Sequence, residues 1–304
     1  MRREKIFSNP YDNGHNIMFN NLKGDYTKSI GVPGKFVEKI NPRVNLKNGV
    51  TGEMDSPYIA DPDGIILHRR VASGLEHQSY NIDDDKLNQM GNYQTHLVVE
   101  THLPTFLPIA THLDPSKSKK ILKRSPTDII ELYFLDLGEK KITKKLSRVS
   151  DKINNNKTVS RDDKIDLGTI VLYAPRHKAR EMTREVVNLY RKISNTMDFN
   201  LEYTLHMVIT IMIDAYFDEK NEYEELINML NNATSTESRN KSESELDMLQ
   251  RLEWREEDLK EANGKLDTTT KKLNEANGKL DKANAEIARL KAENKKLKTG
   301  TNNI

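Results

Sequence analysis

The sequence contains no cysteine, only 6% aromatic residues and no long hydrophobic run. Without cysteine the chain has no disulfide, no thiolate metal site and no cysteine nucleophile, which fits a reducing cytoplasm. Its longest apolar run, from Met207 to Ala215, is too short to span a bilayer and contains Asp214. The first residues carry charges but no apolar segment of the kind found in a secretory signal. We therefore expect a cytoplasmic protein that does not enter a membrane.

A strong charge of one sign is also missing, because 48 basic residues face 46 acidic ones and the net charge is only +2. Bulk charge therefore predicts no partner. Basic residues do gather locally, in two runs: Lys117, Lys119, Lys120, Lys123 and Arg124, and then Lys140, Lys141, Lys144, Lys145 and Arg148. Such runs can follow a phosphate backbone, although they are more often solvated faces, and both interpretations stay open.

Composition and periodicity divide the 304 residues into five segments. We expect N-terminal loops with one short helix, an α/β core, a helical part of the same domain, a flexible linker rich in Ser, Thr and Asn, and a coiled coil. In that order the segments are residues 1–50, 51–175, 176–230, 231–244 and 245–298.

The expected core has five local signals. A turn at residues 61–64 (DPDG) predicts a β-hairpin with strands at residues 58–60 and 65–67. Three aspartates at residues 83–85 predict the start of a helix. Residues 106–112 and 129–137 read as further strands, and residues 139–155 read as a basic helix.

A heptad repeat is the clearest pattern in the C-terminal segment. One apolar row recurs every seven residues and is followed, at the next position, by Asn294; its members are Leu252, Leu259, Leu266, Leu273, Leu280 and Ile287. A second row, offset by three residues, runs from Ala262 to Leu297. Both rows lie on one stripe of a helix, which two or more helices bury by pairing. A buried Asn favours a parallel two-stranded coil, so we expect a homodimer.

The sequence lacks a phosphate-binding loop of the GxxxxGK[ST] type and the GxSxG and HExxH motifs, and its histidines are not at metal spacing. One acidic constellation remains. Alternation along a strand places Glu76 and Gln78 on one face, and Asp55 or Asp61 on the neighbouring strand adds a second carboxylate. Two carboxylates with a polar neighbour can hold Mg²⁺, which activates water for attack on a phosphodiester. An acidic hairpin is also often merely solvated.

The motif Leu75-Glu76-His77-Gln78-Ser79, a helix carrying Tyr93 and the Pro-bracketed segment LPTFLPIATHLD together resemble the PD-(D/E)XK nuclease superfamily. The resemblance is to the Rpn-type recombination-promoting nucleases and their transposase-like relatives, and it spans about residues 50 to 140. In that branch the E-x-K signature is often E-x-Q followed by Ser. The resemblance implies a restriction-endonuclease-like fold, with a mixed β-sheet flanked by helices.

The resemblance also implies site residues. Glu76 would bind the metal, and Gln78 would replace the lysine that orients the attacking water. Asp55 is the preferred partner acid, although its 21-residue separation from Glu76 requires a bulge or insertion around residues 69–74. Asp61 is the alternative acid, and Glu53 could add a contact.

The resulting expectation is a Mg²⁺- or Mn²⁺-dependent endonuclease that cuts DNA and is paired through its coiled coil. Lys120, Lys123 and Arg124 would contact phosphates. The alternative is an inactive nuclease fold that serves as a scaffold or interaction protein, because Gln78 lacks the charge of a lysine. Metal binding through Asp55 and Glu76 would discriminate between the two.

Overall fold

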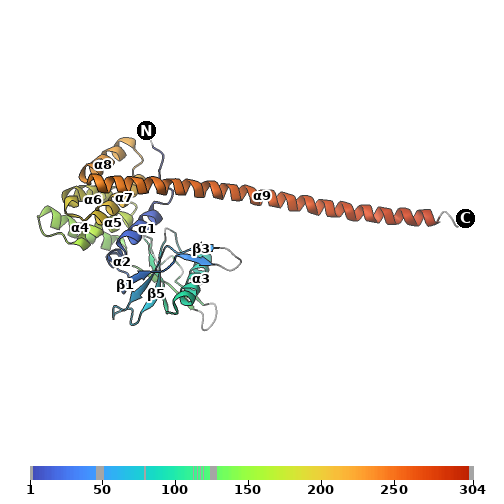
Figure 1. The fold of residues 1–304 in the computed structure, drawn as a ribbon, viewed down its shortest axis with the longest axis horizontal. Helices are drawn as coiled ribbons and strands as arrows, with labels where there is room; N and C mark the ends of the chain where they lie inside the picture. Colours follow the sequence, from blue (N-terminus) through green and yellow to red (C-terminus); the bar gives the residue numbers. More distant parts are fainter. Residues whose placement is uncertain are drawn as a thin grey trace. The chain divides into compact units, whose positions relative to one another are not determined.

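Helices flank a six-stranded mixed β-sheet in this protein (Figure 1). The computed structural model describes residues 3–45, 51–78, 80–111, 113, 114, 116, 118, 120–123 and 129–300. The chain divides into two compact units, residues 1–247 and residues 248–304. The first unit holds the sheet and all helices up to the beginning of the last one.

The sheet region begins with two helices, α1 (Pro10–Leu22) and α2 (Gly24–Ile30), and contains one further helix, α3 (Asp84–Thr101). Its strands are β1 (Lys35–Lys39), β2 (Arg43–Asn45), β3 (Thr51–Glu53), β4 (Ser56–Asp61), β5 (Val71–His77), β6 (Thr105–Phe106), β7 (Pro108–Ala110), β8 (Ile121–Lys123), β9 (Ile129–Glu131) and β10 (Tyr133–Phe134). The helical region that follows consists of α4 (Glu139–Asn154), α5 (Arg161–Leu172), α6 (Ala179–Ile193), α7 (Phe199–Tyr216), α8 (Lys220–Ala233) and α9 (Thr236–Gly300).

The main sheet has the strand order β1-β4-β5-β7-β10, and β6 also pairs with β5. β1, β4 and β5 are antiparallel, whereas β5, β7 and β10 are parallel. The parallel step is made by α3, which connects β5 to the strands beyond it, as parallel pairing requires a long crossover. The expectation of a mixed sheet flanked by helices is therefore confirmed.

The hairpin of β4 and β5 differs from the expected one. Its register runs without interruption from Ser56 opposite Leu75 to Ala60 opposite Val71. The second strand therefore begins at residue 71 and not at residue 65, and the extra length between Asp55 and Glu76 lies in the connecting loop, not in a bulge at residues 69–74. The predicted turn residues do shape that loop: the Asp63 carboxylate accepts three backbone N–H groups from residues 65–67, and Gly64 has a φ of +76°.

Helix α3 covers one face of the sheet. Asp83 caps it by accepting the Lys86 backbone N–H at 2.9 Å, which confirms the helix start expected from the aspartates. Its apolar stripe packs on the sheet in one buried cluster that includes Ala72 of β5, together with Met54, Ile82, Leu87, Met90, Tyr93, Leu97, Leu107, Ile109, Ile130 and Leu132. Because side chains alternate along β5, Glu76 faces the same side as Ala72, toward α3.

Helices α1 and α2 belong to the opposite face of the sheet, where the rings of Phe19, Phe36 and Tyr58 pack together. The expectation of loops and one short helix over residues 1–50 is therefore wrong, because this segment supplies two helices and two strands. Its Asn- and Gly-rich composition hid a buried face formed by Met18, Phe19, Leu22, Tyr26 and Ile30.

Two expected strands are each divided in the structure. Residues 106–112 yield β6 and β7, which end at residue 110, and His112 lies outside the described residues. Residues 129–137 yield β9, which pairs with β8, and β10, which pairs with β7. The chain passes from the small hairpin to the main sheet at Leu132, a buried residue.

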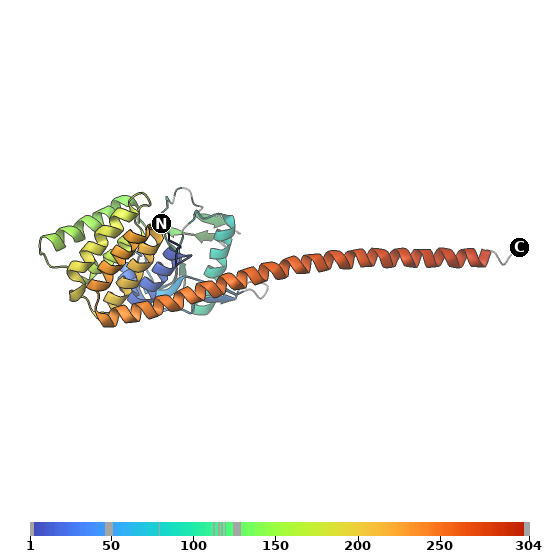
Figure 2. The ribbon, with the colours of Figure 1, turned by 90° about the horizontal axis from the view of Figure 1, so that it is seen from above.

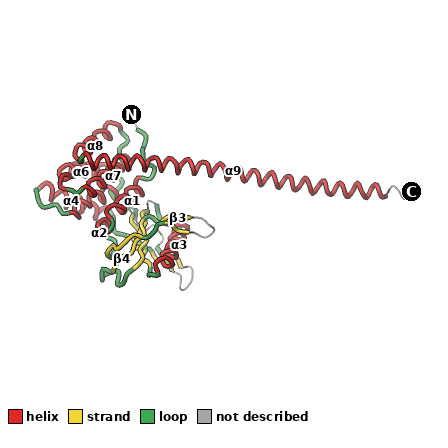
Figure 3. Tube along the Cα trace, viewed as in Figure 1, coloured by secondary structure: helices red, strands yellow, loops and turns green. Residues whose placement is uncertain are grey.

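The helices α4 to α8 gather on one side of the first unit, away from α3, in both ribbon views (Figure 2). Colouring by secondary structure separates the same helical layer from the strands (Figure 3). Helix α7 is the centre of this layer, and thirteen of its residues are buried. None of the helices in the described residues, α7 included, is long and apolar enough to cross a membrane.

The segment expected to be a flexible linker, residues 231–244, is instead helical, since α8 extends to Ala233 and α9 begins at Thr236. Buried polar groups fix this junction. The Glu202 carboxylate accepts hydrogen bonds from the hydroxyls of Ser235 and Ser238, at 2.5 and 2.6 Å. His206 contacts the Ser242 hydroxyl at 2.6 Å. The serines that suggest a linker in the sequence therefore make hydrogen bonds to α7 at the start of α9.

Helix α9 continues as a single helix through residue 300, and the second unit consists of its C-terminal part. Its apolar row is exposed, with between 49% and 63% of each side chain accessible in Leu252, Leu259, Leu266, Leu273, Leu280 and Ile287. The side chain of Asn294 lies outside the described residues. The helix expected there is present, and its pairing into a coiled coil stays a prediction.

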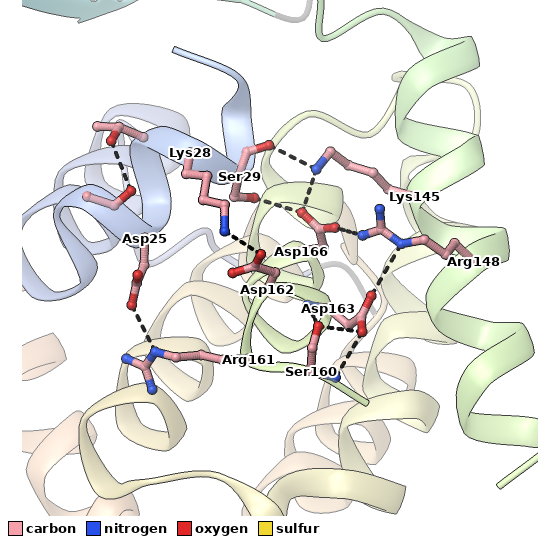
Figure 4. Close-up of polar contacts among 12 residues, drawn as sticks. Asp25, Lys28, Ser29, Lys145, Arg148, Ser160, Arg161, Asp162, Asp163 and Asp166 are labelled. Carbon is pink, nitrogen blue, oxygen red and sulfur yellow. Dashed lines mark hydrogen bonds and ion pairs between the residues drawn. The ribbon is translucent and has the colours of Figure 1, made fainter. Parts of the chain in front are cut away.

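Two buried aspartates join α4, α5 and α2 in a network of ion pairs (Figure 4). Asp166 accepts from Lys145, Arg148 and the Ser29 hydroxyl. Asp163 pairs with Lys152 at 2.7 Å and closes a capping box with Ser160 at the start of α5. Lys145 and Arg148, which belong to the second basic run, therefore neutralise internal carboxylates.

We expect Asp166→Ala to lower the free energy of unfolding by about 3 kcal/mol, because Lys145 would lose its carboxylate partner in a site where its side chain is only 12% exposed. Urea denaturation measures the change. The matched control is Asp162→Ala, whose exposed partner is Lys28, and it should behave like the loss of a surface ion pair. Equal losses in the two variants would contradict a structural role for the buried network.

Candidate active site

Asp55 and Glu76 meet where β4 begins and β5 ends. The Asp55 backbone N–H donates to Glu76 Oε1 at 3.1 Å, and the His77 backbone N–H donates to Asp55 Oδ2 at 2.8 Å. Each carboxylate therefore accepts a hydrogen bond from the backbone of the other strand. This reciprocal pair holds both side chains at one end of the sheet.

Glu76 is almost completely buried, with 2% of the residue exposed. Burial is the main cause that raises the pKa of Glu76 to about 8, and the negative charge of Asp55 raises it further. The Lys86 ammonium and the hydrogen bond from Asp55 act in the opposite direction. A carboxyl group that needs a positive charge to ionise is thus held beside a second carboxylate.

Lys86 is a cation that contacts Glu76. Its Nζ lies 3.4 Å from Glu76 Oε2, and it reaches the site from the first turn of α3. The Asp83 cap fixes the backbone of that turn. Lys86 Nζ also lies over the Tyr93 ring, 6.0 Å from its centre.

The other face of β5 carries His77, whose side chain is fully buried among rings from distant segments. Tyr11 stacks on it with ring centres 6.1 Å apart, and His15 and Tyr173 lie at 5.6 and 5.8 Å. The Tyr26 hydroxyl links His15 and Tyr173, at 2.9 and 3.0 Å. Burial lowers the pKa of His15 to about 3, so this ring is neutral at physiological pH.

Asp12 of α1 adds a third carboxylate to the surroundings. Its Oδ1 lies 3.8 Å from His77 Nε2. Burial raises the pKa of Asp12, and the charge of Lys86 lowers it, which places Asp12 within electrostatic range of that lysine. The site therefore draws charged groups from α1, the β4–β5 hairpin and α3.

The remaining acids of the sequence prediction lie elsewhere or outside the description. Asp61 is at the opposite end of β4, where it accepts from Arg70 at 2.6 Å and pairs in register with Lys35 of β1. The side chain of Glu53 lies outside the described residues. Of the two candidate partner acids, the structure brings Asp55 to Glu76 and leaves Asp61 away from it.

Gln78 follows β5 directly, and its backbone N–H donates to the Ala110 carbonyl at 3.0 Å. Lys120 and Lys123 are exposed next to and within β8, and Arg124 lies outside the described residues. Lys120 Nζ lies 5.7 Å from the centre of the Phe134 ring. These lysines therefore lie in the sheet region of the first unit, at β8.

The acidic pair supplies two of the oxygen ligands that a divalent cation needs. Mg²⁺ is commonly held by one or two carboxylates and keeps several waters, which Asp55 and Glu76 can satisfy. The raised pKa of Glu76 is consistent with a site whose acids lack sufficient positive charge. No cluster of three or more metal-ligating side chains occurs within the part of the chain that the structure describes.

Sequence reasoning missed Asp12, His77 and Lys86 as members of this site. The sequence could have predicted the position of Lys86. A cation three residues after a helix cap points back along the helix toward the preceding strand. Asp12 gave no signal, since it reaches the site only through the packing of α1 on the sheet.

Comparisons with known proteins add no assignment: no protein-family model matches this chain, and neither a curated protein nor a solved structure is similar to it.

The raised pKa of Glu76 predicts a stability that depends on pH in metal-free protein. An unfolded glutamate titrates near 4.5 and Glu76 near 8, so between these values only the folded state holds the proton. Stability should therefore fall as the pH rises from about 4.5 to about 8, by on the order of 1 kcal/mol for each unit. Urea unfolding in EDTA at several pH values measures the slope.

Glu76→Gln should remove this slope, so its stability relative to the unaltered protein should rise with pH across the window. Asp61→Asn, at an exposed carboxylate of the same strand pair, serves as the control and should keep the slope. A constant difference between Glu76→Gln and the unaltered protein would show that Glu76 titrates normally.

Proposed function

We propose that this protein is a Mg²⁺-dependent endonuclease that hydrolyses phosphodiester bonds of DNA, with Asp55 and Glu76 as its metal-binding carboxylates. The observation that supports the proposal is their convergence with Lys86 at one end of the β4–β5 pair. Perturbed pKa values cluster at functional sites, and here a buried acid with a raised pKa lies beside a second carboxylate and a lysine.

The proposed roles follow from charge and position. Asp55 and Glu76 would hold the ion, which when bound polarises a phosphoryl oxygen and activates water. Lys86 lowers the pKa of Glu76 and offers a positive charge to a phosphate oxygen as negative charge develops there. The hydrogen bonds to the backbone of the partner strand hold both carboxylates in place.

Lys86 takes over the role for which Gln78 lacks the charge. A glutamine can orient a water molecule but cannot stabilise a developing anion as a lysine does. Lys86 comes from α3 and not from β5, so the spacing of the E-x-Q motif does not limit the site. Gln78 keeps a positioning role in the proposal.

Lys120, Lys123 and Arg124 are proposed to contact the DNA backbone. Lys145 and Arg148 are not part of this surface, because they are engaged with Asp163 and Asp166. Lys145 and Arg148 are therefore excluded from the proposed phosphate contacts.

We further propose that α9 pairs with α9 of a second copy as a parallel coiled coil. The support is the exposed row of six apolar side chains at seven-residue spacing, which a lone helix leaves in water. Two nuclease units joined in this way would present two sites to the two strands of a duplex. The same exposed row is the observation that favours the alternative function, a non-catalytic protein that recruits or assembles partners.

The nuclease proposal predicts that purified protein with Mg²⁺ or Mn²⁺ nicks supercoiled plasmid, and that Asp55→Ala and Glu76→Ala each lower the rate at least about 100-fold. Asp61→Ala, the control carboxylate of the same hairpin, should nick at the normal rate. Lys86→Gln should be slower than Gln78→Ala by about 10-fold or more, since only Lys86 carries charge.

Agarose gels measure these rates. An unaltered protein that is inactive with both ions would leave the interaction protein as the function, and full activity in Glu76→Ala would remove the proposed site.

The coiled-coil proposal predicts a dimer of the full-length protein that Leu266→Glu/Leu273→Glu converts to a monomer, because charges at two positions of the seam cannot be buried. Sedimentation velocity measures the mass. Lys271→Glu/Lys282→Glu alters the charge of the helix outside the seam and should leave the dimer intact. A monomeric unaltered protein would contradict the proposal.

A further inference from the structure

A cavity of about 460 Å³ opens between the N-terminal segment, the start of α6 and the end of α7. Its walls combine two tyrosines, Tyr11 and Tyr216, with three cations, Lys5, Arg176 and Arg180. None of the described residues that line it is acidic. A volume of this size lies within the range of small-molecule sites, which is about 300 to 1,000 Å³.

One ring connects this cavity to the acidic pair. Tyr11 lines the cavity and also stacks on His77, the neighbour of Glu76, with ring centres 6.1 Å apart. The next residue along α1, Asp12, contacts the same histidine. Tyr11 and Tyr216 meet edge to face, with ring centres 6.3 Å apart. Tyr11 therefore links the cavity to the end of β5, on the face that carries His77.

The three cations differ in the hydrogen bonds and ion pairs that they make. Lys5 donates to the carbonyls of Asp214 and Ala215 and pairs with Asp218. Arg180 pairs with Glu222 and lies over the Phe217 ring. Arg176 is exposed, and within the described part of the chain it makes no ion pair. Arg176 is thus the cation with the most hydrogen-bonding capacity left for a ligand.

We infer that this cavity is a nucleotide subsite, which binds one unpaired nucleotide of the strand next to the phosphate that is cut. Arginine binds phosphate oxygens through paired N–H groups, and tyrosine rings stack on bases of any sequence. The absence of acidic groups from the described lining favours an anion, and the tyrosines favour one that carries a flat ring.

The choice of ligand rests on the proposed function, but the cavity itself does not. A strand that places a base against Tyr11 or Tyr216 and its phosphate on Arg176 would lie close to the β5 end, where Glu76 is held. DNA with an unpaired nucleotide at the cut should be cleaved faster than a fully paired duplex, because a base stacked inside a double helix cannot reach the tyrosines.

The test is titration calorimetry of the full-length protein in EDTA with thymidine 5′-monophosphate, thymidine and inorganic phosphate as separate probes. The monophosphate should bind most tightly, because it alone offers both the ring and the charge. Arg176→Ala should weaken its binding at least 10-fold, and Arg191→Ala, an exposed arginine of α6 away from the cavity, should not change it.

Tyr216→Phe keeps the ring and should retain binding, which checks that the wall and not one hydroxyl is required. The inference is overturned if the monophosphate binds no better than phosphate, or if Arg176→Ala binds it as well as the unaltered protein. Binding without plasmid nicking would overturn the nuclease and leave the subsite. Nicking without binding would overturn the subsite alone.

Discussion

The reciprocal hydrogen bonds between Asp55 and the end of β5 are the constraint on which the candidate site depends. Each carboxylate accepts a backbone N–H from the opposite strand, so neither can turn away without leaving a donor unsatisfied in a buried place. Two acids are thereby held close together, at a cost visible in the raised pKa of Glu76. The surrounding charges are arranged around this pair: Lys86 approaches from α3 on one face, and Asp12 from α1 on the other.

The rest of the first unit supports that end of the sheet. Helix α3 buries the apolar side of β5, and the His15, Tyr26 and Tyr173 cluster fills the space behind His77. Tyr173 belongs to the end of α5, so the helical layer is tied to the site and not only to itself. The buried aspartates of α5 hold α4 and α2 in turn. A local chemical arrangement therefore depends on packing between segments more than a hundred residues apart.

Part of the fold and of the candidate site was predictable because it depends on local sequence patterns. The heptad spacing predicts the helix of residues 245–298, the aspartates before α3 predict its cap, and the order of acid and strand favours Asp55 over Asp61. The remainder depends on tertiary contacts. No local signal shows that Asp12 reaches His77, or that Ser238 and its neighbours are buried against Glu202. A polar serine-rich segment predicts a linker unless its buried partner is known.

Whether Asp55 and Glu76 form a metal site can be measured by manganese binding, followed by electron paramagnetic resonance. Titration of the full-length protein with Mn²⁺ reports free ion, so it needs neither substrate nor turnover. We expect at least one bound ion per chain, lost in both Glu76→Ala and Asp55→Ala and retained in Asp61→Ala. No binding by the unaltered protein, or equal binding by all three variants, would contradict it.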